Sequence, residues 1–482
     1  MNRRTDPRVE TDRLGDVQIP AGAYWGARTA RARDAFTISG RKPHPRLVDA
    51  TVVIKRAAAL ASAESGRLDQ QVARAVCQAA DEVLNGLWRD QFIVDPFQSG
   101  AGTAHNHNVN EVLCNRALEI LGHPPGSYAI IHPDHHVNMA QSANDVFPTA
   151  MRISILGAVK ELQPVVLDLE RLLRRKSLEF DKILKAGRTH LQDATPISLG
   201  QEFNAYGSSV ERSSRRIKDA TNQLLEVNLG ATTTGTGIDA DPAWVSRVVE
   251  MLCQFSGFRL RAGEDYFRLT QSAADFLELS SSLKEFAVEL VKISSDLRLL
   301  CSGPRAGLAE INLPPVFTEP ASLLPGVLPD RAYPVMAECL TMVAFQVIGN
   351  DTVVTLAAQA GQLELNAMTP VIIDNLLESL DFLRNAIAAF NQRCISGITA
   401  NAARCRDLLD STGTGAIALI SHVGYDRVVE LVRESLKAGV SVRELVLAQG
   451  LMTPEALDRV LLQKSITQPG SVPGTTGSTD TD

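Results

Sequence analysis

Long apolar seams whose steps alternate between three and four residues constrain this chain most. One seam occupies Ile155, Val159, Leu162, Val166, Leu169 and Leu173. A second occupies Phe276, Leu279, Leu283, Phe286, Leu290, Ile293 and Leu297. Such steps place one apolar stripe on one side of a helix and suit nearly parallel helix packing. With a third apolar stretch over residues 336–363, they predict a mainly α fold built around a long central helical bundle.

Changes in composition along the chain divide it into predicted domains. We predict a mixed and helical N-terminal domain over 1–150, with helical pattern at 48–90, and the long-helix bundle over 151–395. A small helical C-terminal domain follows over 396–468. The low-complexity tail, 469–482, is predicted to be disordered. Helices this long bury only part of their surface within one chain, so we expect several chains to associate.

Charge and cysteine content exclude several classes of protein. The chain has 48 basic and 55 acidic residues, a net charge of −7, which argues against nucleic-acid or anionic-membrane partners. It has no uninterrupted apolar run of about 18 residues, so no membrane span is predicted, and its first residues lack the apolar core of a signal peptide. The seven cysteines are scattered without a CxxC pair. Reduced thiols in a cytoplasmic protein are therefore expected.

Three segments are dense in small polar residues: SGAGTAHNHN at 99–108, NMAQSAND at 138–145 and GRTHLQD at 187–193. Each stands before a run of helical pattern, where free backbone amides suit a bound carboxylate. The segments supply hydroxyls, amides and one imidazole but few fixed charges. That set suits the orientation of a small polyanion. The alternative for each segment taken alone is ordinary helix capping.

Two other interpretations of these polar residues are weak. The TTTGTG run at 232–237 lacks a preceding strand and a following GKS or GKT, which a phosphate-binding loop needs. The pairs His105 with His107 and His135 with His136 have no cysteine or carboxylate set to complete a metal site. We therefore predict no metal.

Several longer stretches occur in a recognisable order. They are DRLG (12–15), AYWG (23–26), SGAGTAHNHNVNEV (99–112), HVNMAQSANDVFPTA (136–150), GRTHLQDATPISLGQEF (187–203), LGATTTGTGIDADP (229–242), SGPRAGLAEINLP (302–314), VIGNDTVVTLAAQAGQLELN (347–366), GITANAARC (397–405) and VRELVLAQGLM (442–452). Over residues 10–465 the chain resembles the aspartase/fumarase superfamily, most closely its aspartate ammonia-lyase and class II fumarase branch.

The resemblance implies a three-domain, mostly helical fold. It also implies a homotetramer whose central helices form one bundle and whose active sites each draw on three subunits. The implied reaction is elimination of an amine or water from a small dicarboxylate or amino-acid substrate to give fumarate, without a cofactor.

The resemblance also assigns site residues. Thr103 and Ser142 would bind the substrate carboxylate, while Asn144, Thr189 and the catalytic His190 would hold the leaving amine or the other carboxylate. Proton loss next to a carboxylate gives a doubly charged enediolate, which preorganised donors stabilise by about 3–4 kcal/mol each. His132 falls where fumarases have a secondary dicarboxylate site, and we treat it as a bystander.

The loop over 314–334 departs from the family signature GSSxMPxKxNP, whose serine is the base and whose Lys and Asn bind a carboxylate. Alignment of ASLLPG (321–326) with the signature makes Ser322 the base but puts Val327 and Pro329 at the Lys and Asn positions. A gapless alignment from VIGND puts Pro325 at the base position. Arg331 then replaces the Lys and becomes a candidate carboxylate-binding cation, and Tyr333 replaces the Asn.

A further departure is Ala143, where aspartases carry threonine. Three hypotheses follow. The first is a carbon–nitrogen lyase acting on aspartate or an N-substituted aspartate, with Ser322 as base. The second is a cofactor-free decarboxylase of an amino diacid that uses the same pocket. The third is an inactive paralogue or a non-catalytic subunit.

Overall fold

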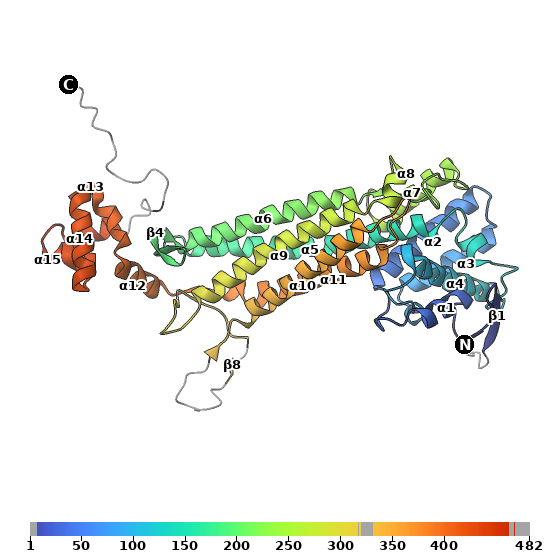
Figure 1. Ribbon diagram of the computed structural model, residues 1–482, viewed down its shortest axis with the longest axis horizontal. Helices are drawn as coiled ribbons and strands as arrows, with labels where there is room; N and C mark the ends of the chain where they lie inside the picture. Colours follow the sequence, from blue (N-terminus) through green and yellow to red (C-terminus); the bar gives the residue numbers. More distant parts are fainter. Residues whose placement is uncertain (1–6, 317, 320–330, 462–466, 468–482) are drawn as a thin grey trace, which may run out of the picture. The chain divides into compact units, whose positions relative to one another are not determined.

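The computed structural model describes residues 7–316, 318–319, 331–461 and 467 (Figure 1). Two compact units account for them. The first unit comprises 1–164, 213–288 and 343–384, and the second comprises 165–212, 289–342 and 385–482. The mainly α prediction is confirmed. The predicted disordered tail and Ser322 lie outside the described residues, and the predicted domain boundaries near 150 and 395 stay predictions.

The first unit contains the elements before residue 143 and those between residues 226 and 271. They are β1 (Arg8–Asp12), β2 (Gly15–Ile19), α1 (Ala27–Ala35), α2 (Pro45–Glu64), α3 (Gln70–Leu84), η1 (Arg89–Gln91), η2 (Gly100–Gly102), α4 (Thr103–Ile120), η3 (Pro133–Val137), β5 (Glu226–Val227), α7 (Pro242–Ser256), β6 (Arg261–Ala262) and α8 (Tyr266–Gln271). Five long helices contribute residues to both units: α5 (Ala143–Glu179), α6 (Leu199–Gln223), α9 (Ala274–Leu300), α10 (Val335–Gln359) and α11 (Thr369–Arg393).

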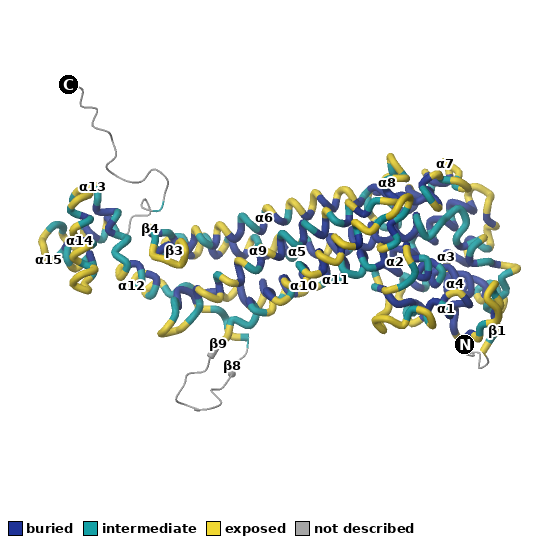
Figure 2. The backbone as a smooth tube through the Cα atoms, in the orientation of Figure 1, coloured by how far each residue is buried: buried dark blue, intermediate teal, exposed yellow. Residues whose placement is uncertain are grey.

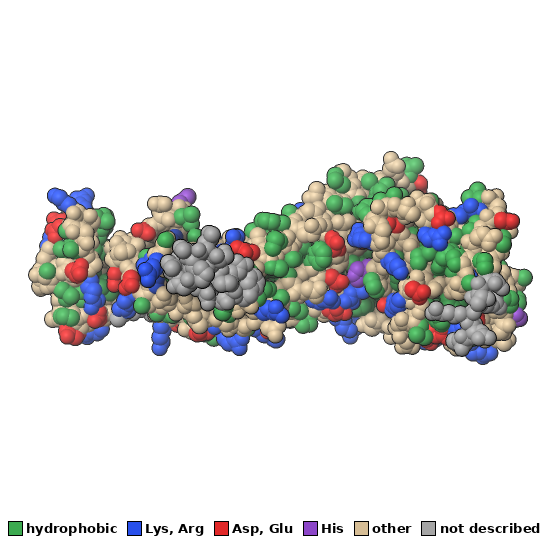
Figure 3. All heavy atoms as spheres, turned by 90° about the horizontal axis from the view of Figure 1, so that it is seen from below, with side chains coloured by type: hydrophobic (Ala, Val, Ile, Leu, Met, Phe, Trp, Pro, Cys, Tyr) green, Lys and Arg blue, Asp and Glu red, His purple; other side chains and the backbone are tan. Residues whose placement is uncertain are grey.

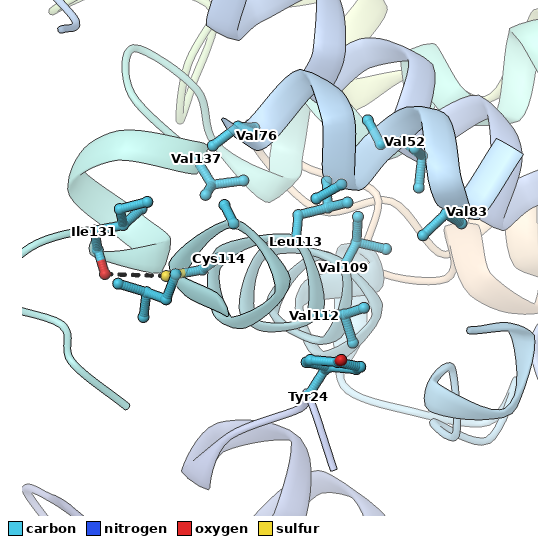
Figure 4. Packing of buried hydrophobic residues seen from close by; sticks show 14 of the residues in the cluster. Tyr24, Val52, Val76, Val83, Val109, Val112, Leu113, Cys114, Ile131 and Val137 are labelled. Atoms are coloured by element: carbon cyan, nitrogen blue, oxygen red, sulfur yellow. Dashed lines mark hydrogen bonds between the residues drawn. The ribbon is translucent and has the colours of Figure 1, made fainter. Parts of the chain in front are cut away.

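Helix α4 runs through the core of the first unit (Figure 2). Its apolar residues Val109, Val112 and Leu113 are fully buried in a cluster with residues of α2 and α3 (Figure 4). The Cys114 thiol is buried there too and donates to the Ile131 carbonyl at 3.1 Å. All seven cysteines are free.

Several polar side chains of α4 are buried as well and bond to the backbone of neighbouring segments. Asn108 donates to the Gln91 carbonyl at 3.0 Å, and Asn115 donates to the Tyr24 carbonyl at 2.7 Å. The Glu111 carboxylate accepts the Gly26 amide at 2.7 Å. A buried polar group is tolerated when it is paired in this way. Helix α4 therefore fixes the loops around it through hydrogen bonds as well as apolar packing.

Both predicted heptad seams lie on single continuous helices, α5 and α9, and their side chains are almost completely buried. The third stretch forms α10, which ends at Gln359 rather than at 363. The helical pattern at 48–90 corresponds to two helices, α2 and α3. Asp69 begins the second, since its carboxylate accepts the amides of Gln71 and Val72 at 2.7 and 3.1 Å.

Among the described helices, α10 alone is long and apolar enough to cross a membrane on those two grounds. Buried helices of a protein core meet the same two criteria. At its middle the Asp351 carboxylate is buried and accepts the Ser280 hydroxyl of α9 at 2.8 Å. The Lys284 ammonium binds the same carboxylate. These polar contacts tie one side of α10 to α9.

The second unit contains a long hairpin and the C-terminal helices. Its elements are β3 (Leu184–Thr189), β4 (Gln192–Ser198), β7 (Ile311–Asn312), β8 (Thr318–Glu319), β9 (Arg331–Ala332), η4 (Ile395–Gly397), β10 (Thr399–Ala400), α12 (Ala402–Thr412), η5 (Thr414–Leu419), α13 (Ile420–Val423), α14 (Tyr425–Ala438), α15 (Val442–Ala448) and α16 (Pro454–Leu461). Strands β3 and β4 pair antiparallel, as do β7 with β10 and β8 with β9. Helices α14 to α16 enclose a small core around Leu419, Leu431, Val446 and Leu457.

Candidate active site

A tight backbone turn fixes Thr103 at the first residue of α4. Ala101 and Gly102 precede it with φ of +56° and +68°, and the Ala101 amide donates to the Ala367 carbonyl at 3.0 Å. A Cβ on Gly102 would lie 2.1 Å from a ring carbon of Phe147. Thr103 is partly exposed, and its hydroxyl donates to the Gly100 carbonyl at 3.1 Å. The turn therefore holds this hydroxyl where a ligand can reach it.

We expect Gly102→Ala to destabilise the protein by about 1–3 kcal/mol more than Gly40→Ala, because the added methyl overpacks against Phe147. Gly40 is a matched control: its φ is +69°, and a Cβ there would meet nothing within 4 Å. Urea unfolding of both variants measures the difference. Equal losses would show that the left-handed backbone alone, and not the close approach to Phe147, requires glycine at position 102.

The second polar segment joins the start of α5 to the TTTGTG run through Asp145. Its fully buried carboxylate accepts the amides of Ser142 at 2.9 Å, Gly230 at 3.1 Å and Thr232 at 3.0 Å. Burial raises the pKa of Asp145 to about 6. The Asn144 side chain adds a bond to the Thr233 carbonyl at 2.7 Å. In the first unit, the first amide of the TTTGTG run and the Gly230 amide just before it therefore pair with a carboxylate of the chain itself.

The first two polar segments are linked to each other inside the first unit. The Asn106 side chain, one turn after Thr103 on α4, donates to Asn138 at 3.3 Å. Asn138 in turn donates to the Gln141 carbonyl at 3.1 Å, directly before Ser142. These bonds therefore join the two segments that carry Thr103, Ser142 and Asn144 into one polar framework. The expectation that these two segments stand at helix starts is confirmed, at α4 and α5.

Lys55 is the group in this framework that the sequence patterns missed. It lies on α2 within the apolar run TVVIKRAAAL and is fully buried. Its ammonium donates to Asn138 Oδ1 at 2.6 Å and to Gln141 Oε1 at 3.1 Å. Burial lowers the pKa of Lys55 to about 7. A charged residue at a helix position surrounded by apolar ones is the only signal that could have identified it.

The third polar segment does not stand at a helix start, and that expectation is wrong. It forms the tip of the β3–β4 hairpin, and α6 begins only at Leu199. His190 and Leu191 make the two-residue turn with φ of +55° and +59°. A hairpin turn of this type needs positive φ at both central residues, which is unfavourable for side chains with a Cβ. Such backbone strain clusters at functional sites.

The hairpin tip is exposed on the second unit, and Leu191 has 71% of its surface accessible. Thr189 and His190 are exposed beside it. Below the tip the strand is anchored, because Arg188 binds the fully buried Glu310 carboxylate through two bonds of 2.9 and 3.1 Å. Lys185 binds the same carboxylate at 2.9 Å and also binds Glu202 at 2.9 Å. A rigid base therefore presents the two polar side chains to the surroundings.

Of the signature loop at 314–334, the structure describes residues 314–316, 318–319 and 331–334. Ser322 is outside the described residues. The backbone of Arg331 pairs with Glu319 between β9 and β8. The assignments of Ser322 as base and Arg331 as carboxylate-binding cation therefore stay predictions.

The histidines near η3 contact one another and the local backbone. His132 Nδ1 accepts the Asp134 amide at 3.0 Å, and the His132 and His135 rings lie 4.3 Å apart. Burial lowers the pKa of His132 and of His136. Within the described ranges, no three His, Cys, Asp or Glu side chains are arranged to hold a metal ion.

Sequence comparison places the chain among lyases. Residues 15–349 match the family described as Lyase, and residues 417–468 match Fumarase C C-terminus. Aspartate ammonia-lyase of Bacillus subtilis (strain 168) is 46% identical over 98% of both chains. Fumarate hydratase class II of Thermosynechococcus vestitus is 40% identical over 94% of this chain and 97% of its own.

Structural comparison gives the same family. The fumarate lyase:delta crystallin of Brucella melitensis, solved bound to cobalt, superposes with a TM-score of 0.92 at 41% identity and covers 96% of this chain and 100% of its own. Class II fumarase of Schistosoma mansoni gives 0.88 at 31% identity with the same coverage. The chain therefore belongs to the aspartase/fumarase superfamily and is a lyase of that type.

Proposed function

We propose that the protein eliminates ammonia, or a substituted amine, from aspartate or an N-substituted aspartate to give fumarate or a related unsaturated acid. The carrying observation is that hydrogen bonds join the two segments that carry Thr103, Ser142 and Asn144 at the starts of α4 and α5. The relative named aspartate ammonia-lyase is 46% identical over nearly the whole length. The comparisons name lyases of this superfamily, so decarboxylation and an inactive paralogue are not favoured.

The proposed chemistry follows from the acidity of the substrate. A Cβ proton beside a carboxylate is lost only if the enediolate that forms is stabilised. The hydroxyl groups of Thr103 and Ser142 serve that purpose, since fixed donors need no reorganisation when charge develops. Ser322 is the proposed base, and Arg331 is a proposed second contact for a carboxylate. Asn144, Thr189 and His190 hold the amine side of the substrate. No cofactor is proposed.

We also propose a homotetramer with shared active sites. Helix α10 supports it, because its exposed apolar residues Met342, Phe345, Val353 and Leu356 all fall on one side of the helix. An apolar stripe of this kind is typical of a surface that a neighbouring helix covers. The exposed tip with Thr189 and His190 would reach a site formed by another subunit.

The proposed partner is a small dicarboxylate or amino-acid substrate, without nucleic acid or membrane. On the face drawn in Figure 3, the described Lys and Arg side chains are interspersed with Asp and Glu. Binding of a nucleic acid normally needs a continuous basic patch. We propose a cytoplasmic location, which the seven free cysteines support. The three predicted domains, 1–150, 151–395 and 396–468, likewise stay a proposal.

Ultraviolet absorbance of fumarate tests the proposed activity directly. The purified protein is incubated with aspartate and with a series of N-substituted aspartates, and the conjugated double bond is followed. We expect absorbance to rise with at least one substrate and an equal amount of amine to be released. Release of carbon dioxide without the absorbance, or no reaction with any substrate, would contradict the proposal.

We expect Asn144→Ala to raise KM by about 10- to 100-fold, since a hydrogen bond to a charged group contributes about 1.5–3 kcal/mol. Asn85→Ala is the control, because Asn85 is exposed at the end of α3. Steady-state kinetics on the best substrate measures the change. An unchanged KM would remove Asn144 from the substrate pocket.

A further inference from the structure

Lys55 carries a buried positive charge that no acidic side chain neutralises directly. Its ammonium bonds to the amide oxygens of Asn138 and Gln141, and among the described residues the acidic groups Asp145 and Asp134 act on it only through space. Amide oxygens offset only part of the cost of moving an ammonium ion out of water. The position is therefore electrostatically incomplete in the free protein.

The acidic groups near Lys55 do not neutralise its ammonium. Asp145 and Asp134 are the acidic groups that act on Lys55 from a distance, from α5 and η3. Asp145 already accepts three backbone amides, and Asp134 forms an ion pair with Arg28 at 2.7 Å. Neither acid therefore supplies a counter-ion that is dedicated to Lys55.

The titratable groups of the other neighbouring elements are uncharged or paired. On α4, burial lowers the pKa of His105 to about 3 and that of His107 to about 4, so both are neutral near pH 7. Burial also lowers the pKa of His132 and His136 on η3. Asp81 on α3 pairs with Arg56, the residue after Lys55, and Arg247 on α7 pairs with Glu64 at the end of α2.

The two amides that Lys55 contacts belong to the substrate framework. Gln141 directly precedes Ser142. Asn138 Oδ1 accepts a hydrogen bond from the side-chain amide of Asn106, which lies one turn after Thr103. Lys55 therefore bonds directly to the amide side chain that joins the two segments proposed to bind the carboxylate. A positive charge at this depth acts through a poorly polarisable interior, where Coulomb interactions are several times stronger than in water.

We propose that Lys55 supplies the positive charge for the substrate carboxylate held by Thr103 and Ser142, and that its Nζ, which is partly neutral in the free protein, takes up a fraction of a proton from solvent when a dicarboxylate binds. The inference rests on the proposed function, because it assumes that this pocket binds the substrate. Lys55 touches the amides and not the substrate, so it is a positioning residue and not a catalytic one. Lys55 adds a positive charge to a pocket whose hydrogen-bond donors are uncharged.

The direction of the pH effect follows from linkage. In the free protein the pKa of Lys55 is about 7, so the side chain is half neutral there, and a bound anion raises that pKa. Binding is then tightest below pH 7 and weakens as the pH rises through the free pKa. A rise of about one unit on binding corresponds to about tenfold in affinity. Above about pH 9 the lysine is neutral in both states and the effect disappears.

Calorimetric titration with succinate tests the proposal without turnover, because both carboxylates of succinate stay ionised across the range used. Titrations from about pH 6.5 to 9 in buffers of different ionisation enthalpy give affinity and proton uptake together. Lys55→Gln keeps a donor for the amide oxygens but has no charge, and Lys55→Met is an apolar variant of similar size. Thermal unfolding of the unliganded variants shows whether either one is misfolded.

We expect the wild-type protein to take up a fraction of a proton near pH 7.5 and Lys55→Gln to take up none. At pH 6.5 the variant binds succinate about tenfold more weakly, and the two affinities converge near pH 9. Unchanged proton uptake or a constant affinity ratio in a folded variant would overturn the inference alone. Absence of succinate binding together with absence of turnover in the wild-type protein would overturn the proposed function and this inference with it.

Discussion

Replacing Ser322 with alanine should lower kcat about 10³-fold and leave KM little changed. General-base catalysis contributes about 10²- to 10⁴-fold, and alanine cannot accept the Cβ proton. The other donors of the pocket remain, so the variant should still bind the substrate. Exchange of the Cβ proton with deuterated water, followed by NMR, measures proton removal separately from amine release. In Ser322→Ala we expect both rates to fall together.

Ser411→Ala is the matched control, since Ser411 is exposed near the end of α12 and its hydroxyl bonds only to the Leu408 carbonyl of its own helix. Full turnover in Ser322→Ala would show that the base lies elsewhere. The gapless alignment of the loop would then be the better one. In that alignment Pro325 occupies the position of the base serine, and proline cannot remove a proton.

Replacing Glu310 with alanine should destabilise the second unit by about 3–5 kcal/mol. The carboxylate is fully buried and binds both Lys185 and Arg188, so its removal leaves two largely buried cations without their shared partner. Because Arg188 immediately precedes Thr189, we also expect the hairpin tip to lose its fixed orientation. Urea unfolding of the full-length chain measures the first effect, and kcat measures the second.

Glu202→Gln is the control for this change. Glu202 belongs to the same cluster but binds only Lys185, so the contact between Arg188 and Glu310 survives. We expect a loss of stability below about 1 kcal/mol, because Glu202 is partly exposed, and an unchanged kcat. Equal effects of the two substitutions would show that Glu310 does not anchor the hairpin in particular.

The sequence predicted what depends on local order along the chain. The seams on α5 and α9 are visible because each apolar residue lies three or four positions from the next, on the same side of one helix. The polar segments at the starts of α4 and α5 can also be recognised in the sequence, because their residues are neighbours along the chain. The predicted family follows from ten such stretches in order, and the comparisons confirm it.

The features that could not be predicted depend on distant partners. Lys55 contacts Asn138 and Gln141 across more than 80 residues of chain, and Asp145 contacts Gly230 and Thr232 at a similar separation. The His190–Leu191 turn contains none of the Gly or Asn residues that mark such hairpins, so the sequence does not indicate a hairpin at the third polar segment. Its backbone is held by the surrounding strand pair, which no local pattern reveals.

The apolar stripe on α10 has a consequence for how mutants of this protein are interpreted. Phe345 and Leu356 lie on that stripe, and neither belongs to the polar framework of Thr103, Ser142 and Asn144. If subunits complete one another's pockets, a polar substitution on the stripe would silence the enzyme by mass action, and a higher protein concentration would restore it. Specific activity should therefore be compared across a dilution series before any inactive variant is attributed to a defect in chemistry.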